Sequence, residues 1–320
     1  MKKIPEEVWA FDAEWIPDPL AGRLLYGLPD TMTDAEVMQH MWRQAAKSRS
    51  LIPTEADLAM DTHDFLQEGV NRPYLKTNLC RLVSVSAVVR RQKAGQSPKL
   101  VLLSLPASWD EPVKNHEPEI IHRFLGKLDQ RISGPLTDFK GNPKSGYGKG
   151  IQIVGYNSSG ADFHIFVQRA IINGMQFEKL NDRPTWPKDG VDYYSDQSPF
   201  HVDLQRLVGG FNRSNPSLNE MATLSGIPGK MDTNGNEVSL LWLAGQLDEI
   251  IRYNEFDALT TYLLWLRVMH FLGNFSATEY ATEQQLVENL IAELSPQPRY
   301  AHLQQFQEEW NRLRRLTGQL

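Results

Sequence analysis

Two acidic residues stand inside an apolar segment near the start of the chain. Residues 8–15 read VWAFDAEW, which predicts a buried strand that carries Asp12 and Glu14. Residues two apart on a strand point to the same face, so both carboxylates point the same way. Burying two ionised acids without partners is costly. The strand therefore either presents the acids to a cation or lies at a sheet edge where that face meets solvent.

A second polar group follows the apolar segment 151–155. Asn157 lies just beyond this predicted strand, and Asp162 lies in the first turn of a helix predicted over 161–173. Ligands of open α/β sheets bind at such strand ends. In the alternative, one of the small residues at 158–160 caps the helix, and Asp162 only complements the helix dipole.

A third pair lies on a helix predicted over 239–272, with a break near Gly245. Tyr253 stands four residues before Asp257, so the two side chains share one helical face amid apolar neighbours. A tyrosine at the boundary of a helix and the core is also a common structural feature. This pair alone favours a structural role.

The four carboxylates need cations if they point at one place. Crowded acids repel one another and raise one another's pKa, whereas one or two hard divalent ions would keep them ionised. Because all these ligands are oxygens, the set suits magnesium or manganese and not zinc.

The order of the predicted elements favours an α/β class with a mixed central sheet flanked by helices. Apart from the segments above, strands are expected at 81–91, 99–106 and 201–204, and helices at 117–132 and from Ser217, which has Glu220 at capping-box spacing.

Two additions are expected around this sheet. A polar insertion, about 17–75, contains a helix that begins at a capping box of Thr33 and Glu36 and forms a lid or flank. Two amphipathic helices, 282–294 and 299–316, form a C-terminal appendage. We expect one domain over 1–275 and a helical extension over 276–320.

The composition indicates the cellular compartment and limits the kinds of binding partner. Cys80 is the only cysteine, which excludes an internal disulfide, and no segment is apolar and long enough for a signal peptide or a membrane span. A reducing cytoplasm is therefore expected. The net charge of −6 argues mildly against tight nonspecific binding of nucleic acid, although a metal-dependent nuclease needs few basic groups.

The three motifs together resemble the DEDD superfamily of 3'-5' exonucleases, which has a ribonuclease H-like fold. Tyr253 four residues before Asp257 places the chain with the tyrosine branch, because the histidine branch would have histidine at the position of Arg252. Four segments are similar to stand-alone bacterial nucleases related to the proofreading domain of family B DNA polymerases: GRLLYGLPD (22–30), HVDL (201–204), LSGIPGK (224–230) and YNEFDALTTYLLWLR (253–267). Trp15 and Ala161 depart from the family pattern, and both could alter the grip on the terminal nucleotide.

The resemblance implies the roles of the site residues. Asp12 would bridge two metal ions, Glu14 and Asp257 would complete the site that activates water, and Asp162 would hold the second ion. Tyr253 would orient the attacking water. The expected substrate is a free 3' end of single-stranded nucleic acid, with DNA slightly favoured over RNA and nucleoside 5'-monophosphates as products.

Candidate substrate contacts are more weakly indicated. Asn157 would hold the aspartate of the first strand or the terminal sugar. Lysines that could meet phosphates are Lys140, Lys144 and Lys149 in a glycine-rich loop, and Lys230. The loop is equally well explained as a solvated hairpin, and a hydrogen-bonded structural role is preferred for Asp203.

Two other functions stay open from the sequence. One is a catalytically silent module that binds nucleic acid or protein, against which the intact acids count. The other is a phosphodiesterase of small nucleotides.

Overall fold

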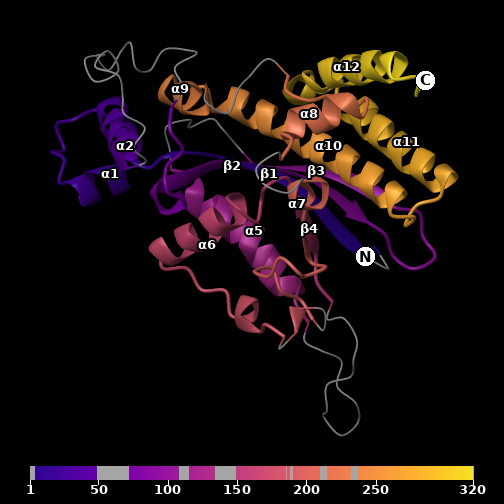
Figure 1. Ribbon diagram of the computed structural model, residues 1–320, viewed down its shortest axis with the longest axis horizontal. Coiled ribbons are helices and arrows are strands. Elements are labelled where there is room, and N and C mark those ends of the chain that lie inside the picture. The colour runs from indigo at the N-terminus through magenta and orange to yellow at the C-terminus, as the bar shows by residue number, and fades with distance from the viewer. Residues whose placement is uncertain are drawn as a thin grey trace, which may run out of the picture.

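A mixed sheet of five strands, in the order β3-β2-β1-β4-β5, forms the centre of the protein (Figure 1). The computed structural model describes residues 4–48, 72–107, 115–133, 149–184, 186–187, 190–209, 215–231 and 237–319. Its strands are β1 (Glu7–Pro17), β2 (Cys80–Arg91), β3 (Lys99–Leu105), β4 (Gln152–Gly155) and β5 (His201–Asp203). The pairs β1–β2 and β2–β3 are antiparallel, and the pairs β1–β4 and β4–β5 are parallel. The predicted α/β class with a ribonuclease H-like mixed sheet is confirmed.

The strand that carries Asp12 and Glu14 is the middle strand of this sheet. β1 pairs with β2 on one side and with β4 on the other, so the alternative of a solvated edge strand is wrong. The pairing of β1 with β2 is irregular beyond Glu14: Glu14 lies opposite Ser84, whereas Trp15 lies opposite Leu82. Such a bulge bends a strand and re-aims its side chains. It occurs directly beside the acidic pair.

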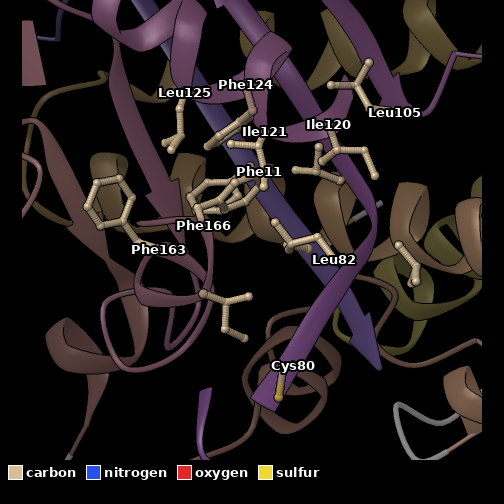
Figure 2. Close-up of a cluster of buried hydrophobic side chains, with 14 of the residues drawn as sticks. Phe11, Cys80, Leu82, Leu105, Ile120, Ile121, Phe124, Leu125, Phe163 and Phe166 are labelled. Carbon is tan, nitrogen blue, oxygen red and sulfur yellow. The ribbon is translucent and has the colours of Figure 1, made fainter. Parts of the chain in front are cut away.

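One face of the sheet packs against α5 (Glu117–Arg131) and α6 (Asp162–Ile172). Figure 2 shows the aromatic centre of this core, where Phe124 of α5 contacts both Phe11 of β1 and Phe166 of α6. Successive residues of a strand point to opposite faces, so the odd-numbered residues of β1 from Trp9 to Ala13 belong to this layer.

The other face packs against a long helix and the C-terminal helices. α9 (Val238–Leu243) ends at a turn in which Gly245 adopts a left-handed φ of 73°, and α10 (Leu247–Phe271) follows. The predicted break near Gly245 is confirmed. Val8 and Ala10 of β1 share a core with buried residues of α10 and of the C-terminal helices.

The C-terminal helices are α11 (Ala277–Leu294) and α12 (Leu303–Leu316), with a 3-10 turn at Pro298–Tyr300 between them. α11 begins five residues before the predicted start because Ser276 and Glu279 form a capping box. Both helices bury apolar side chains in the core of α10, among them Ile291 of α11 and Trp310 of α12. A buried ion pair between Arg90 of β2 and Glu283 of α11 ties them to the sheet. They form a layer of the fold, and the boundary at 275 stays a prediction.

The insertion contains two helices in the described residues, α1 (Pro19–Tyr26) and α2 (Asp34–Ser48), which lie beyond one end of the sheet (Figure 1). The predicted capping box of Thr33 and Glu36 is present at the start of α2. α1 was not predicted; Asp18 caps it by accepting a hydrogen bond from the backbone of Leu20.

The remaining helices connect these layers. They are α7 (Leu204–Val208) and α8 (Leu218–Leu224), with 3-10 turns at Thr77–Leu79 and Lys179–Asn181. The predicted capping box of Ser217 and Glu220 is present at α8. Among the described residues, no helix has the length and hydropathy that crossing a membrane requires. Cys80 is buried at the start of β2 and has a free thiol.

Candidate active site

Three carboxylates from two distant segments meet between β1 and α10. Asp12 and Glu14 point to the α10 side of the sheet, where α10 presents Asp257. One oxygen of each side chain lies within 4.8 Å of one oxygen of each of the others. Glu14 is 8% exposed and Asp257 is 9% exposed. The predicted convergence of these three acids is thus present.

Asp162 borders this cluster from the start of α6. It is the first residue of the helix and is 8% exposed, and its charge acts on both Asp12 and Glu14. The residue at the N-cap position is Ala161, which supplies no side-chain cap. The alternative in which a residue at 158–160 caps the helix is therefore wrong.

The turn that carries Asp162 is held by the side chain of Asp203. Its carboxylate accepts hydrogen bonds from the backbone N–H groups of Asn157 (2.9 Å) and Ser159 (3.1 Å), and from the Ser159 hydroxyl. It also accepts a bond from the backbone of Gln205 and so caps α7. Asp203 has the structural role preferred from the sequence. By fixing the turn, it positions Asp162.

Asn254 is a site residue that the sequence analysis missed. Its side-chain N–H donates to Oδ2 of Asp12 (2.8 Å), and its oxygen accepts from the hydroxyl of Ser84 on β2 (3.1 Å). Asn254 itself is fully buried. One signal was present: a polar residue three positions before Asp257 lies on the same helical face as Asp257.

Asn157 is exposed and has a left-handed φ of 59°, a conformation that asparagine adopts more readily than most residues. The amide that contacts Asp12 among the described residues is that of Asn254. The first role predicted for Asn157 is therefore filled by another residue, and contact with the substrate's terminal sugar stays a prediction.

The pKa values of the acids are raised because the carboxylates are buried together. The pKa of Asp12 is raised by desolvation and then by the charges of Glu14, Asp257 and Asp162, against which the hydrogen bond from Asn254 acts. The pKa of Glu14 is also raised, first by desolvation and then by Asp257 and Asp162. In the metal-free protein, these acids therefore hold protons that ordinary carboxylates would have lost.

The other two acids are shifted less. Desolvation raises the pKa of Asp162 to about 7, and a hydrogen bond from the side chain of Trp15 opposes the shift. Desolvation raises the pKa of Asp257 to about 6, opposed by a hydrogen bond from Tyr253 and by the charge of Lys230.

Tyr253 is 6% exposed, and its hydroxyl lies near the carboxylate of Asp257, whose pKa it lowers as a hydrogen-bond donor would. Its pKa is raised well above the usual value, first by desolvation and then by the neighbouring acids, Asp257 foremost. The phenol is therefore protonated at neutral pH and acts as a hydrogen-bond donor.

The cluster has the chemistry of a site for hard divalent cations. All of its ligand atoms are carboxylate oxygens, and the raised pKa values reflect negative charge that a cation would compensate. A further oxygen lies opposite Asp12 on β2: the hydroxyl of Ser86 is buried and has no hydrogen-bond partner within the described part of the chain. The residues present thus fit a metal centre.

The lysines predicted to contact phosphates differ in their position relative to the acidic cluster. Lys230 is exposed and acts electrostatically on both Glu14 and Asp257, so it lies beside the acidic cluster. Lys149 is exposed in an isolated bridge with Ser133. Lys140 and Lys144 lie outside the described residues.

Comparison with known protein families finds a match to this chain, whereas comparison with curated proteins finds none. The matching family is described as predicted 3'-5' exonucleases related to the exonuclease domain of PolB, and the match covers residues 147–310, just over half of the chain. This range includes Asp162, Asn254 and Asp257, whereas β1 precedes it. Exonuclease domains of this kind use divalent metals, in keeping with the acidic cluster. The chain belongs to the family of predicted 3'-5' exonucleases related to the exonuclease domain of PolB.

Proposed function

We propose that this protein is a metal-dependent 3'-5' exonuclease of the tyrosine branch. It removes nucleoside 5'-monophosphates from free 3' ends of single-stranded nucleic acid. The observation that carries the proposal is the meeting of Asp12, Glu14 and Asp257 within 4.8 Å, bordered by Asp162 and by the hydroxyl of Tyr253. Membership of the exonuclease family supports it.

The four carboxylates would hold two ions, magnesium or manganese. When bound, these ions would supply positive charge at the attacking and leaving oxygens of the phosphodiester. Asp12 is central to this arrangement, because three other acids act on it and Asn254 fixes one of its oxygens.

Tyr253 orients the attacking water. Its hydroxyl is protonated and lies against Asp257, so it can direct the water by hydrogen bonding but is a poor acceptor of the proton. Water attacks the phosphorus, and the bond from phosphorus to the 3' oxygen of the preceding nucleotide breaks. The phosphate therefore leaves with the released nucleotide as a 5'-monophosphate.

The substrate preference follows from charge and burial. Three of the acids are at least nine-tenths buried, so a phosphate must enter a recessed site, and a paired end must fray before it can enter. Lys230 is the basic residue beside the cluster that would meet a phosphate of the strand. DNA is favoured slightly over RNA because the family is related to a polymerase proofreading domain.

The test is a sequencing gel with 5'-labelled single-stranded DNA and RNA of one sequence, incubated with magnesium, manganese or chelator. We expect a ladder that shortens from the 3' side only when metal is present. Cutting of a circular single strand would instead indicate an endonuclease. Hydrolysis of dinucleotides alone would indicate a phosphodiesterase of small nucleotides, and binding without hydrolysis would indicate a silent module.

A further inference from the structure

Beside the acidic cluster, two aromatic rings lie in contact, and one of them is exposed. Trp15 follows Glu14 directly on β1, and Tyr74 lies in the segment that leads into β2. The ring centroids are 6.5 Å apart, and the ring planes are tilted by 53°. Tyr74 is 70% exposed, so burial of its ring in the core does not explain why the ring lies against Trp15.

Trp15 connects this ring pair to the reacting centre. The side chain of Trp15 lies near Asp162, where it lowers the pKa of that carboxyl as a hydrogen-bond donor would. Its indole is partly buried against the core, which limits its movement. The bulge after Glu14 alters the pairing of β1 with β2 at Trp15 and so helps to aim this side chain. One side chain therefore separates the ring of Tyr74 from a carboxylate of the site.

The backbone on both sides of Tyr74 is anchored. Arg72 is 7% exposed and lies over the ring of Trp42, 5.3 Å from its centroid, and Leu75 is 7% exposed in the core. Because these two residues are buried, the backbone at Tyr74 has little freedom to move. The exposed ring is thus presented from an anchored backbone and rests against Trp15, which reduces the entropy lost on binding.

We propose that Tyr74, supported by Trp15, is a stacking platform for a base of the substrate strand. This inference rests on the proposed function and adds a binding subsite to it. The base belongs to one of the two nucleotides that flank the scissile phosphate, because Tyr74 lies one side chain away from Asp162. Stacking on an aromatic ring accepts any base, since every base has a π face.

The negative net charge of the chain favours a strand-binding contact that needs no positive charge. The net charge is −6, and the cluster itself is acidic, so basic groups contribute little to holding a strand. Stacking holds an unpaired base without positive charge, and a base within a duplex is not free to stack in this way. Tyr74 would thus contribute to the choice of single-stranded ends.

The experiment compares wild type with Tyr74→Ala and Tyr74→Phe on single-stranded oligonucleotides that differ in one abasic position. The abasic position is the terminal, the penultimate or the fifth nucleotide from the 3' end. For wild type, we expect loss of one of the first two bases to lower kcat/KM about ten-fold, and loss of the fifth base to have little effect. For Tyr74→Ala, we expect kcat/KM to be about ten-fold lower on the intact strand, mainly through KM, and the same abasic position to cost almost nothing more.

Two controls separate stacking from a structural effect. Tyr74→Phe keeps the ring and should retain the wild-type kcat/KM. Phe271→Ala removes an aromatic ring that is 84% exposed and about 21 Å from Asp257 along α10, and it should change nothing. Equal kcat/KM for Tyr74→Ala and wild type, or an equal cost of each abasic position in both, would overturn the proposal.

A binding measurement separates this inference from the proposed function. Fluorescence anisotropy of a labelled single strand is measured with calcium on Asp257→Asn, with and without Tyr74→Ala. The platform predicts about ten-fold weaker binding when Tyr74 is replaced, and equal binding would count against it. If wild type shows no metal-dependent shortening, the proposed function fails, whereas an active wild type that is indifferent to Tyr74→Ala rejects the platform alone.

Discussion

The side chain of Asn254 donates a hydrogen bond of 2.8 Å to Asp12, from the helix on one face of the sheet to its central strand. A second bond, from the hydroxyl of Ser84, fixes the amide. The residue thus orients Asp12, on which the charges of the other three acids act, without being an acid itself. Replacing a group that orients a metal ligand in this way typically costs about ten- to a hundred-fold in metal affinity or activity.

Asn254→Ala should therefore lower kcat/KM by about ten- to a hundred-fold and raise the metal concentration needed for half-maximal rate. The measurement is a metal titration of the initial rate. Asn289→Ala, on the exposed side of α11, is the matched control and should behave as wild type. An unchanged metal requirement in Asn254→Ala would show that the amide only fills space.

Tyr253→Phe removes the hydroxyl that lies against Asp257 and keeps the ring. We expect kcat to fall by roughly ten- to a thousand-fold, which is the scale of losing one well-placed catalytic group. Single-turnover rates and strand affinity should be measured together. If the affinity falls while the rate of the bound strand is unchanged, the tyrosine holds substrate and does not orient water.

The metal-free protein should lose stability as the pH rises. The pKa values in the folded state are about 7 for Asp162 and about 6 for Asp257, above the value near 4 of an unfolded chain. Folding therefore favours the protonated acids. Their contribution to the free energy of unfolding is complete below about pH 4 and is lost as the pH rises toward about 7.

Thermal melting in chelator tests whether the metal-free protein loses stability as the pH rises. The melting temperature of Asp257→Asn should exceed that of wild type increasingly from about pH 4 to about pH 7, because the amide does not ionise. Added magnesium should remove the difference by stabilising wild type. An identical pH dependence of the two proteins in chelator would contradict the electrostatic account.

Single-stranded 3' ends should be degraded faster than blunt duplex ends. A paired end must unpair before its phosphate reaches the recessed acids, and the acidic chain offers little basic surface to stabilise the opened duplex. Initial rates on matched oligonucleotides at one salt concentration decide the point. Faster removal from the blunt duplex would indicate a duplex-binding surface on the insertion or on the C-terminal helices.

Much of the fold was predictable because its signals are local. The apolar run around Asp12 predicts β1, and Gly245 marks the break before α10. Spacing alone also predicts that Asp12 and Glu14 share a face, as do Tyr253 and Asp257.

Other features depend on contacts between distant segments. The packing of Trp310 into the core of α10 makes the C-terminal helices a layer of the fold, and neither helix reveals its partner through its own periodicity. Asn254 gains its role only when α10 lies over β1. The contact of Tyr74 with Trp15 likewise depends on a segment that returns to the sheet beyond the insertion.

The most direct test of the central claim is the initial rate on a 5'-labelled single strand for wild type, Asp12→Asn and Asp257→Asn, with magnesium and with chelator. Each substitution preserves size and removes a charge from the cluster of three acids. We predict shortening from the 3' end by wild type with magnesium alone, and almost no turnover by either variant although both melt at or above the wild-type temperature. Wild-type turnover in either variant, or an equal rate for wild type in chelator, would contradict the account.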